Sequence, residues 1–412
     1  MNLHERLRRV EEQEPLLEAL LPEPSRRVRL SAEREALHQR YPEDSDRPAL
    51  FCVPIGVKDL FHVEGFVTQA GSALPPELFS GPEASVVTRL KQAGGLILGK
   101  TVATEFAFSE PGPTRNPHNP DHTPGGSSSG SAAAVAAGYV PVALGTQTIG
   151  SISRPASYCG VIGVKPSYGR IPTVGCVPFS ESADHVGFFA ESWEWVQRVA
   201  PVLYDGWSES DAGSNNHPLR IGFITGSYAD EADEDMQQVL AATIDQLAAR
   251  GHDPLPIQLF DDWSTLVEMH YDLIAREKAE FHREWFAEYQ QLYRPGTREL
   301  IERGQAVSAQ RAYTIRAHQL ALRQQIDQLM IKEGIDLWLT PGATGPAPQG
   351  LHFTGNPRCN LPWSFTGLPT ITFPVTKTSE GLPLGIQAVG RFGQDERLLA
   401  DLFKWIVQER PA

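Results

Sequence analysis

The order of apolar and polar residues predicts a chain in which short buried strands alternate with helices. Apolar side chains recur at helical spacing over residues 5–21, and prolines end that helix. Residues 51–57 form an unbroken apolar run typical of a buried strand, residues 85–93 fit an amphipathic helix, and residues 96–99 predict another short strand. This alternation favours an α/β architecture, with helices on both sides of a mixed sheet.

The second half of the chain repeats this alternation and adds longer helices. A loop is predicted over 111–126, and a surface linker over 205–218, because prolines or small polar residues gather there. Two long charged helices near 263–292 and 305–333 are expected to form a peripheral cap. The remaining predicted elements are a small-residue helix over 131–138, strands at 220–224, 337–339 and 385–389, and a closing helix over 397–408.

Composition and charge narrow the class of protein. The 412 residues are 41% hydrophobic, which is too apolar for a disordered chain, and the net charge of −14 argues against binding nucleic acid through phosphate neutralisation. Four scattered cysteines predict neither a disulfide framework nor a zinc module. No apolar run approaches the roughly 20 residues of a membrane span, and the N-terminus lacks a signal peptide pattern. We therefore expect a cytoplasmic globular protein.

Glycine and serine gather in two segments that could carry chemistry. Residues 125–131 read Gly-Gly-Ser-Ser-Ser-Gly-Ser, and residues 145–156 read Gly-Thr-Gln-Thr-Ile-Gly-Ser-Ile-Ser-Arg-Pro-Ala. Glycines let the backbone approach a ligand closely, and serines supply hydroxyl groups. Upstream, Lys58 ends an apolar strand. Burial would lower the pKa of such a lysine and allow it to act as a base. This combination suits acyl transfer through a serine nucleophile.

Each of these segments also has a plainer interpretation. A Gly/Ser-rich loop before a helix is often a flexible connection or a phosphate cradle, although no Gly-Lys-Ser/Thr ends either segment as a Walker loop would. Residues 126–130 match the G-x-S-x-G nucleophile elbow, which would make Ser128 the nucleophile, but a proline-rich loop stands where that elbow needs a strand. Lys58, taken alone, could be a surface charge at a strand end.

Together, the segments closely resemble the amidase signature family of Ser–Ser–Lys hydrolases. The resemblance runs from about residue 51 to the C-terminus and also includes residues 160–170, 184–187, 367–369 and 381–387. It implies the amidase signature fold, a central twisted mixed β-sheet covered on both faces by α-helices. Residues 48–412 would form this domain, after an N-terminal helical segment over residues 1–47.

The resemblance also implies a role for individual positions. Lys58 matches the base, Ser127 matches the middle serine that follows a cis peptide bond and relays a proton, and Ser151 matches the nucleophile. No cofactor or metal is implied. Backbone N–H groups would hold the oxyanion at Thr148, Ile149, Gly150 and Ser151. Residues that could contact substrate are Phe108, Ser128 and Trp363.

The sequence departs from the common family pattern at three places. Gln147 replaces an aspartate and Ser153 an arginine, with Arg154 one position later, so both charges of a pair are exchanged together. Ile149 replaces a glycine of the oxyanion segment; it either strains the backbone, if a positive φ is needed, or narrows the acyl pocket. The loop within residues 105–117 is shorter than in many members, which would open the entrance to the site.

These features predict a hydrolase of linear amide C–N bonds that works through an acyl-enzyme. Carbamates, ureas or esters are alternative substrates for the same three residues. An alternative of another class is the glutaminase-type subunit of a tRNA-dependent amidotransferase complex, and a third is a non-catalytic binding protein. We expect a small-molecule amide or carbamate as substrate, a monomer or homodimer, and no nucleic-acid or membrane partner.

Overall fold

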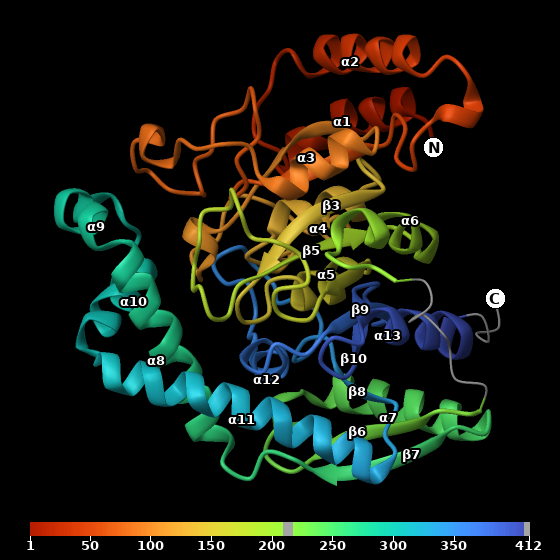
Figure 1. Cartoon of the computed structure of the whole chain (residues 1–412), viewed down its shortest axis with the longest axis vertical. Helices are drawn as coiled ribbons and strands as arrows, with labels where there is room; N and C mark the ends of the chain where they lie inside the picture. The colour runs from red at the N-terminus through yellow and green to blue at the C-terminus, as the bar shows by residue number, and fades with distance from the viewer. Residues whose placement is uncertain (209–216, 408–412) are drawn as a thin grey trace.

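A ten-stranded mixed sheet crosses the whole molecule in the computed structural model, which describes residues 1–208 and 217–407 (Figure 1). The strands lie in the order β2-β1-β3-β5-β4-β9-β10-β8-β6-β7. Both ends of the sheet are parallel, and its centre is antiparallel. The strand bounds are β1 Pro54–Lys58, β2 Leu96–Thr101, β3 Val142–Gln147, β4 Ile162–Lys165, β5 His185–Ala190, β6 Arg220–Thr225, β7 Asp253–Gln258, β8 Leu337–Pro341, β9 Thr370–Lys377 and β10 Pro383–Val389.

Alternate residues of these strands point to opposite faces, and each face is covered by helices. On β3, Val142 and Leu144 join an apolar cluster with α3, α6, α7 and α13, whereas Ala143 joins a second cluster with α1, α2, α4 and α5. The predicted α/β architecture is therefore confirmed. The bounds of these helices are α1 Leu3–Leu17, α2 Arg26–Arg40, α3 Ser85–Gln92, α4 Ser129–Ala136, α5 Ser153–Cys159, α6 Trp193–Leu203, α7 Glu234–Ala249 and α13 Asp395–Asp401.

The segment between β7 and β8 is an arm of helices that lies beside the sheet (Figure 1). The sequence predicted one helix near 263–292, but the chain forms α8 (Trp263–Phe281), α9 (Arg283–Tyr289) and a further helix, α10 (Pro295–Ala306), before α11 (Ala309–Glu333). The break comes at His282, which is buried with its Nδ1 atom 2.9 Å from the Tyr293 hydroxyl, so a tertiary contact folds the chain back.

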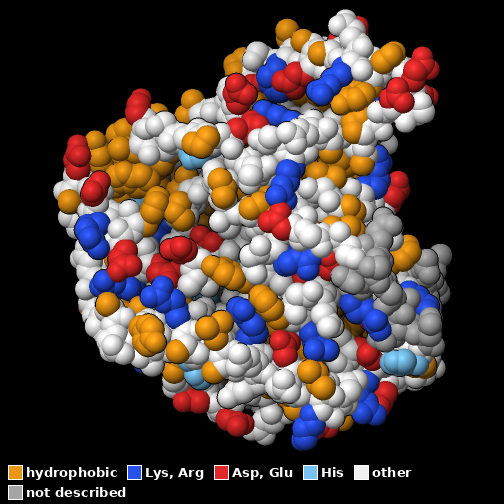
Figure 2. All heavy atoms as spheres, in the orientation of Figure 1, with side chains coloured by type: hydrophobic (Ala, Val, Ile, Leu, Met, Phe, Trp, Pro, Cys, Tyr) orange, Lys and Arg blue, Asp and Glu red, His pale blue; other side chains and the backbone are white. Residues whose placement is uncertain are grey.

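Apolar side chains gather on the surface over α9 and the adjoining end of α8, at the upper left of Figure 2. On α9, Trp285 lies edge-on to Phe79 and Phe281, with ring centroids 5.2 and 5.1 Å apart. Phe281 is 40% exposed.

Other parts of the chain extend the comparison with the predicted elements. At the start of α7, the N-cap residue Asp233 accepts a hydrogen bond from the Met236 N–H. Most of the predicted linker, and the last residue of the predicted closing helix, lie outside the described residues. Within the described part, no helix is long and apolar enough to cross a membrane.

Candidate active site

Lys58 is the last residue of β1, which pairs in parallel with β2 on one side and β3 on the other. Its ammonium is therefore at the carboxyl edge of the parallel strands, where α/β sheets usually place their binding sites. The side chain is fully buried. Its Nζ atom lies 2.8 Å from the Ser127 Oγ atom and 2.7 Å from the Thr146 Oγ1 atom near the end of β3.

The loop before α4 brings Ser127 to this lysine. The peptide bond between Gly126 and Ser127 is cis, as the resemblance implies. A Cβ atom at Gly126 would lie 2.9 Å from the Thr354 methyl group, so a side chain there would crowd the loop. Ser128 is fully buried, and its Oγ atom bonds both the N–H and the carbonyl of Thr146. Two neighbouring serines thus connect the loop to Lys58 and to β3.

Ser151 lies in the turn between β3 and α5, and 7% of its surface is exposed. Gln147 shapes this turn, because its Oε1 atom accepts hydrogen bonds from the N–H groups of Ile152 (2.8 Å) and Ser153 (2.9 Å). Its Nε2 atom donates to the Ser364 hydroxyl at 3.0 Å. Gln147 and Ser153 are both fully buried, which excludes neutral variation on the surface as the reason for their exchange.

The backbone from Thr148 to Ser151 is fixed through its carbonyl groups. His270 Nε2 donates to the Thr148 carbonyl at 3.1 Å, and the Ser364 hydroxyl donates to the Ile149 carbonyl at 2.7 Å. None of the hydrogen bonds found among the described residues uses the N–H groups of Ile149, Gly150 or Ser151. Three neighbouring donors are thus available to a substrate oxygen. Ile149 has no positive φ, so its backbone is ordinary at this position.

Burial determines the electrostatics of the site. Loss of water lowers the pKa of Lys58 to about 7, although Cys176 and Asp184 oppose this shift. Burial also raises the pKa of Asp184, but its carboxylate accepts hydrogen bonds from the Thr148 hydroxyl (2.5 Å) and the N–H groups of Phe179 and Ser180. The Lys58 amine is therefore partly neutral near pH 7, and Asp184 orients the start of the 148–151 backbone.

A cavity of about 620 Å³ reaches this region. Its wall includes Thr146, the hydrogen-bond partner of Lys58, together with Leu60, Ala107 and Phe179. Ile149 belongs to the same apolar cluster as these last three residues. The lining does not include Lys58, Ser127 or Ser151, so Thr146 is what connects this partly apolar cavity with the site.

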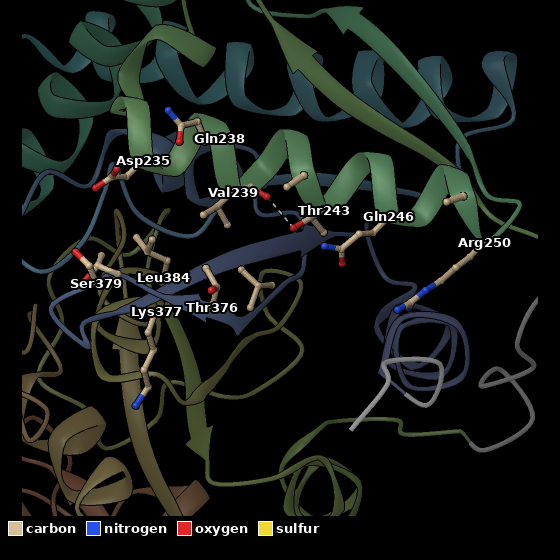
Figure 3. A pocket seen from close by; sticks show the side chains of 14 residues that line it. Asp235, Gln238, Val239, Thr243, Gln246, Arg250, Thr376, Lys377, Ser379 and Leu384 are labelled. Carbon is tan, nitrogen blue, oxygen red and sulfur yellow. Dashed lines mark hydrogen bonds between the residues drawn. The ribbon is translucent and has the colours of Figure 1, made fainter.

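A separate groove of about 920 Å³ lies between α7 and the strands β9 and β10 (Figure 3). The figure shows Gln238, Val239 and Thr243 on the helix side and Thr376 and Lys377 on the strand side. None of its lining residues belongs to the proposed triad or to the 148–151 backbone. The groove thus lies outside the site built around Lys58.

The structure places the three residues expected to contact substrate in different surroundings. Phe108 is half-buried, and its ring centroid lies 5.8 Å from that of Phe179, which lines the cavity, with the two rings tilted by 46°. Trp363 is fully buried on α12 (Leu361–Phe365), with its Nε1 atom 3.4 Å from the Tyr228 hydroxyl. The Ser128 hydroxyl donates a hydrogen bond to the Thr146 carbonyl of β3. Contact with substrate stays a prediction for all three.

Several residues of the site carried no clear signal in the sequence. Ser364, His270 and Thr354 come from segments more than a hundred residues away from the loops they contact. Asp184 lies within a segment quoted for the family resemblance, but its bond to Thr148 was not predicted. The family resemblance pointed to the segments, and only the fold shows these contacts.

A family model, sequence relatives and solved structures all indicate the same protein family. The Amidase family model matches residues 2–399. A glutamyl-tRNA(Gln) amidotransferase subunit from Synechococcus sp. (strain WH7803) is 30% identical over 446 residues, covering 95% of this chain and 90% of that protein. A crystal structure of an amidase superposes with a TM-score of 0.87 at 30% identity, covering 99% of this chain and 95% of the other. A structure of a vestigial protein complex, reported with the origins of an s-triazine catabolic enzyme, has a TM-score of 0.85 at 27% identity, with coverages of 97% and 93%.

Proposed function

This chain belongs to the amidase signature family of hydrolases, and we propose that it cleaves linear amide C–N bonds through an acyl-enzyme on Ser151. In this proposal Ser127 relays a proton and Lys58 is the base. The substrate is a small-molecule amide or carbamate. The enzyme acts in the cytoplasm as a monomer or homodimer.

The chemistry needs one proton path and one oxyanion site. Neutral Lys58 takes the proton of Ser127, Ser127 takes the proton of Ser151, and the Ser151 oxygen attacks the carbonyl carbon. The N–H groups of residues 148–151 stabilise the oxyanion that forms. When this intermediate collapses, the C–N bond breaks and the relayed proton goes to the leaving nitrogen. Water then attacks the acyl-enzyme by the same path and releases the acid.

The observation that carries the proposal is the hydrogen bond between Lys58 and Ser127. Lys58 is fully buried, and no carboxylate lies within bonding distance of it among the described residues. Burying a charged amine in this way is unfavourable, so the surroundings favour its neutral form. Here its pKa is lowered to about 7, and its Nζ atom contacts the serine that would hand it a proton. Burial also lowers the pKa of Lys165 and of Lys278 to about 7, but their amines donate to backbone carbonyls. What sets Lys58 apart is that its partners are hydroxyl groups.

A second candidate function has its own support. Curated relatives at about 30% identity are subunits of glutamyl-tRNA(Gln) amidotransferases. As such a subunit, the chain would release ammonia from an amide for a partner and not act alone. The exchange of the family aspartate and arginine for Gln147 and Ser153 weighs against this candidate. Carbamates, ureas and esters remain alternative substrates of the same acyl-enzyme.

Two measurements test the proposal. A fluorophosphonate probe should label the purified chain once, and peptide mass mapping should find the label on Ser151; labelling should disappear in Ser151→Ala. A panel of simple amides, carbamates, ureas and esters should then show amides as the best substrates by kcat/KM. Labelling elsewhere would contradict the nucleophile assignment, and a preference for carbamates, ureas or esters would contradict the amide assignment.

A further inference from the structure

Lys278 is a lysine of the helical arm that the proposed reaction does not use. It lies on α8 and is fully buried. Its Nζ atom donates to the Phe106 carbonyl at 2.9 Å and lies over the rings of Phe179 and Phe106, at 4.4 and 5.1 Å from their centroids. Because Phe179 and Ala107 line the cavity beside the site, this side chain joins the arm to two segments of the cavity wall.

No carboxylate pairs with this amine. Lys278 forms no ion pair among the described residues, whereas the buried Lys100 is paired with Asp59 at 2.7 Å. Burial lowers the pKa of Lys278 to about 7, and Asp184 and Glu105 oppose this shift. A buried amine without a carboxylate partner is unfavourable, and an apolar side chain of similar length would avoid that cost. The contacts of Lys278 therefore indicate a role other than stability.

The turn that Lys278 contacts has an unusual backbone. Phe106 and Ala107 both lie in the left-handed region, with φ angles of 46° and 62°. Residues other than glycine keep this conformation only where the surrounding structure holds them in it. The Phe106 N–H donates to the Ala70 carbonyl at 2.8 Å, and the Phe106 carbonyl accepts from Lys278. Two segments distant in the sequence thus fix the backbone of Phe106, and the arm supplies one of them.

The same turn connects the cavity with the proposed relay serine. Ala107 lines the cavity, and the Thr104 N–H donates to the Ser127 carbonyl at 3.2 Å. The Thr104 hydroxyl also donates to the Phe108 carbonyl at 2.6 Å, which closes the turn. Thr104 thus anchors the start of the turn to the site, whereas Lys278 holds its middle. Loss of Lys278 should therefore move the cavity wall more than it moves the relay serine.

We propose that Lys278 is a positioning residue that limits the size of the substrate, because it holds the turn at residues 106–107 and the Phe179 ring together as one wall of the cavity. The inference rests on the proposed acyl-transfer function and adds a determinant of its specificity. The amine reaches one wall segment by a hydrogen bond and the other by a cation–π contact. Without it the two segments are free to separate, and the cavity accepts a larger group of the substrate.

Two series of amides test this assignment: one has acyl groups of increasing size and a constant amine, and the other has a constant acyl group and amines of increasing size. Lys278→Met keeps the length of the side chain but removes the donor and the charge. In one series it should raise kcat/KM for the largest member relative to the smallest by about tenfold, mainly by lowering KM for the largest, while kcat for the smallest changes less than about threefold. Lys278→Arg keeps a donor and a charge, so its profile should stay close to that of the wild type.

Lys165 supplies the matched control. It is also fully buried, and its Nζ atom donates to the Leu368 carbonyl at 2.5 Å, but it is not among the residues that line the cavity. Lys165→Met should leave the ratio between large and small substrates unchanged. If Lys278→Met lowers kcat/KM equally for all members of both series, Lys278 only stabilises the arm and the proposal is wrong. An equal change of the ratio in Lys165→Met would also contradict it.

A second variant covers the case in which Lys278→Met does not fold. Ala107→Gly leaves Lys278 in place and puts at this position the residue that adopts positive φ most readily. It removes a methyl group from the wall and loosens the turn, so it should shift the ratio in the same direction by about threefold. An unchanged ratio would overturn the proposal, because the turn would not limit the cavity. Fluorophosphonate labelling of Ser151 in each variant reports on the proposed function independently, so failure of one assignment is distinguishable from failure of the other.

Discussion

Lys58 can act as a base only when its amine is neutral, and its burial makes that possible near neutral pH. Because its pKa is lowered to about 7, the neutral fraction rises as pH increases through that value and saturates above about pH 8. We expect kcat/KM to follow this curve and to fall about tenfold for each unit below pH 7. Lys58→Arg keeps the charge but cannot deprotonate, so it should be inactive at every pH. A flat profile down to about pH 5 would exclude Lys58 as the base.

The two serines of the proposed relay should act as a unit. Ser151→Ala and Ser127→Ala are each expected to lower kcat by about 10⁴-fold or more, and the double variant should lose little beyond that. Steady-state kinetics on one amide, with active-site titration to exclude contaminating enzyme, gives the values. Ser45→Ala, at an exposed position, is the matched control. Additive losses in the double variant would show that the serines act separately.

Ile149 should restrict the acyl group. The structure removes backbone strain as the reason for this residue, because its φ is not positive. Its side chain belongs to the apolar cluster that also supplies Leu60, Ala107 and Phe179 to the cavity wall. Ile149→Ala and Ile149→Gly should raise kcat/KM for longer acyl chains relative to short ones, by about tenfold for two added methylene groups.

The outcome for Ile149 is measured with amides of increasing chain length and a constant leaving group. Ile149→Ala separates side-chain volume from the backbone freedom that glycine adds. A substrate profile that stays the same in both variants would show that Ile149 does not limit the acyl pocket.

The sequence pointed to single residues of the site better than to their surroundings. Lys58, Ser127 and Ser151 stand in contiguous motifs, so the resemblance to the family could be carried over to each position. The contact of Arg154 with Gly126, and that of Ser364 with Ile149, depend on how distant loops pack. No local pattern contains such information, because each of these bonds joins segments that meet only after the sheet has formed.

The turn between β3 and α5 depends on one buried amide. Gln147 satisfies two backbone N–H groups at the start of α5 and also binds Ser364, so it replaces an acidic residue without introducing a charge. In Gln147→Met, the methionine side chain has a volume similar to that of glutamine but leaves these N–H groups without an acceptor. We expect the free energy of unfolding to fall by about 2–4 kcal/mol, and kcat to fall with the loss of order around Ser151.

Chemical denaturation and kinetics together test the role of Gln147. Ser364→Ala is the comparison variant, because it leaves both N–H contacts of Gln147 in place while it removes the hydroxyl that bonds the Gln147 Nε2 atom and the Ile149 carbonyl. Its loss of stability should be clearly smaller. A Gln147→Met protein as stable as the wild type would contradict the capping role.

The ends of helices and strands were predicted well where nearby residues in the sequence determine them. The strand ending at Lys58 and the helix near 85–93 were predicted within a few residues, since apolar runs and glycines mark their limits. The helical arm was predicted poorly. Its break at His282 rests on a buried contact with Tyr293, and charged residues continue through the break without a change in pattern.

The order of the strands explains why the site lies where it does. β1 and β3 are parallel neighbours, so Lys58 and Thr146 both come from their carboxyl ends, and the loops that follow carry the remaining residues. α4 and α5 then pack on one face of the sheet and hold the two serine-bearing loops. Deep burial of Lys58 thus depends on the neighbouring strands of the sheet as well as on the Gly/Ser loop that carries Ser127.

Whether the molecule works alone separates the two candidate functions. If it is an amidase, the purified chain should release ammonia or amine from simple amides at a rate that no added protein increases, because its base, relay and nucleophile all belong to one chain. Size-exclusion chromatography with light scattering should show one or two copies during turnover. A member of an amidotransferase complex would give only slow release that rises at least about tenfold when its partner proteins and charged tRNA are added, through coupling of the sites. That result would replace the amidase assignment while leaving the proposed triad in place.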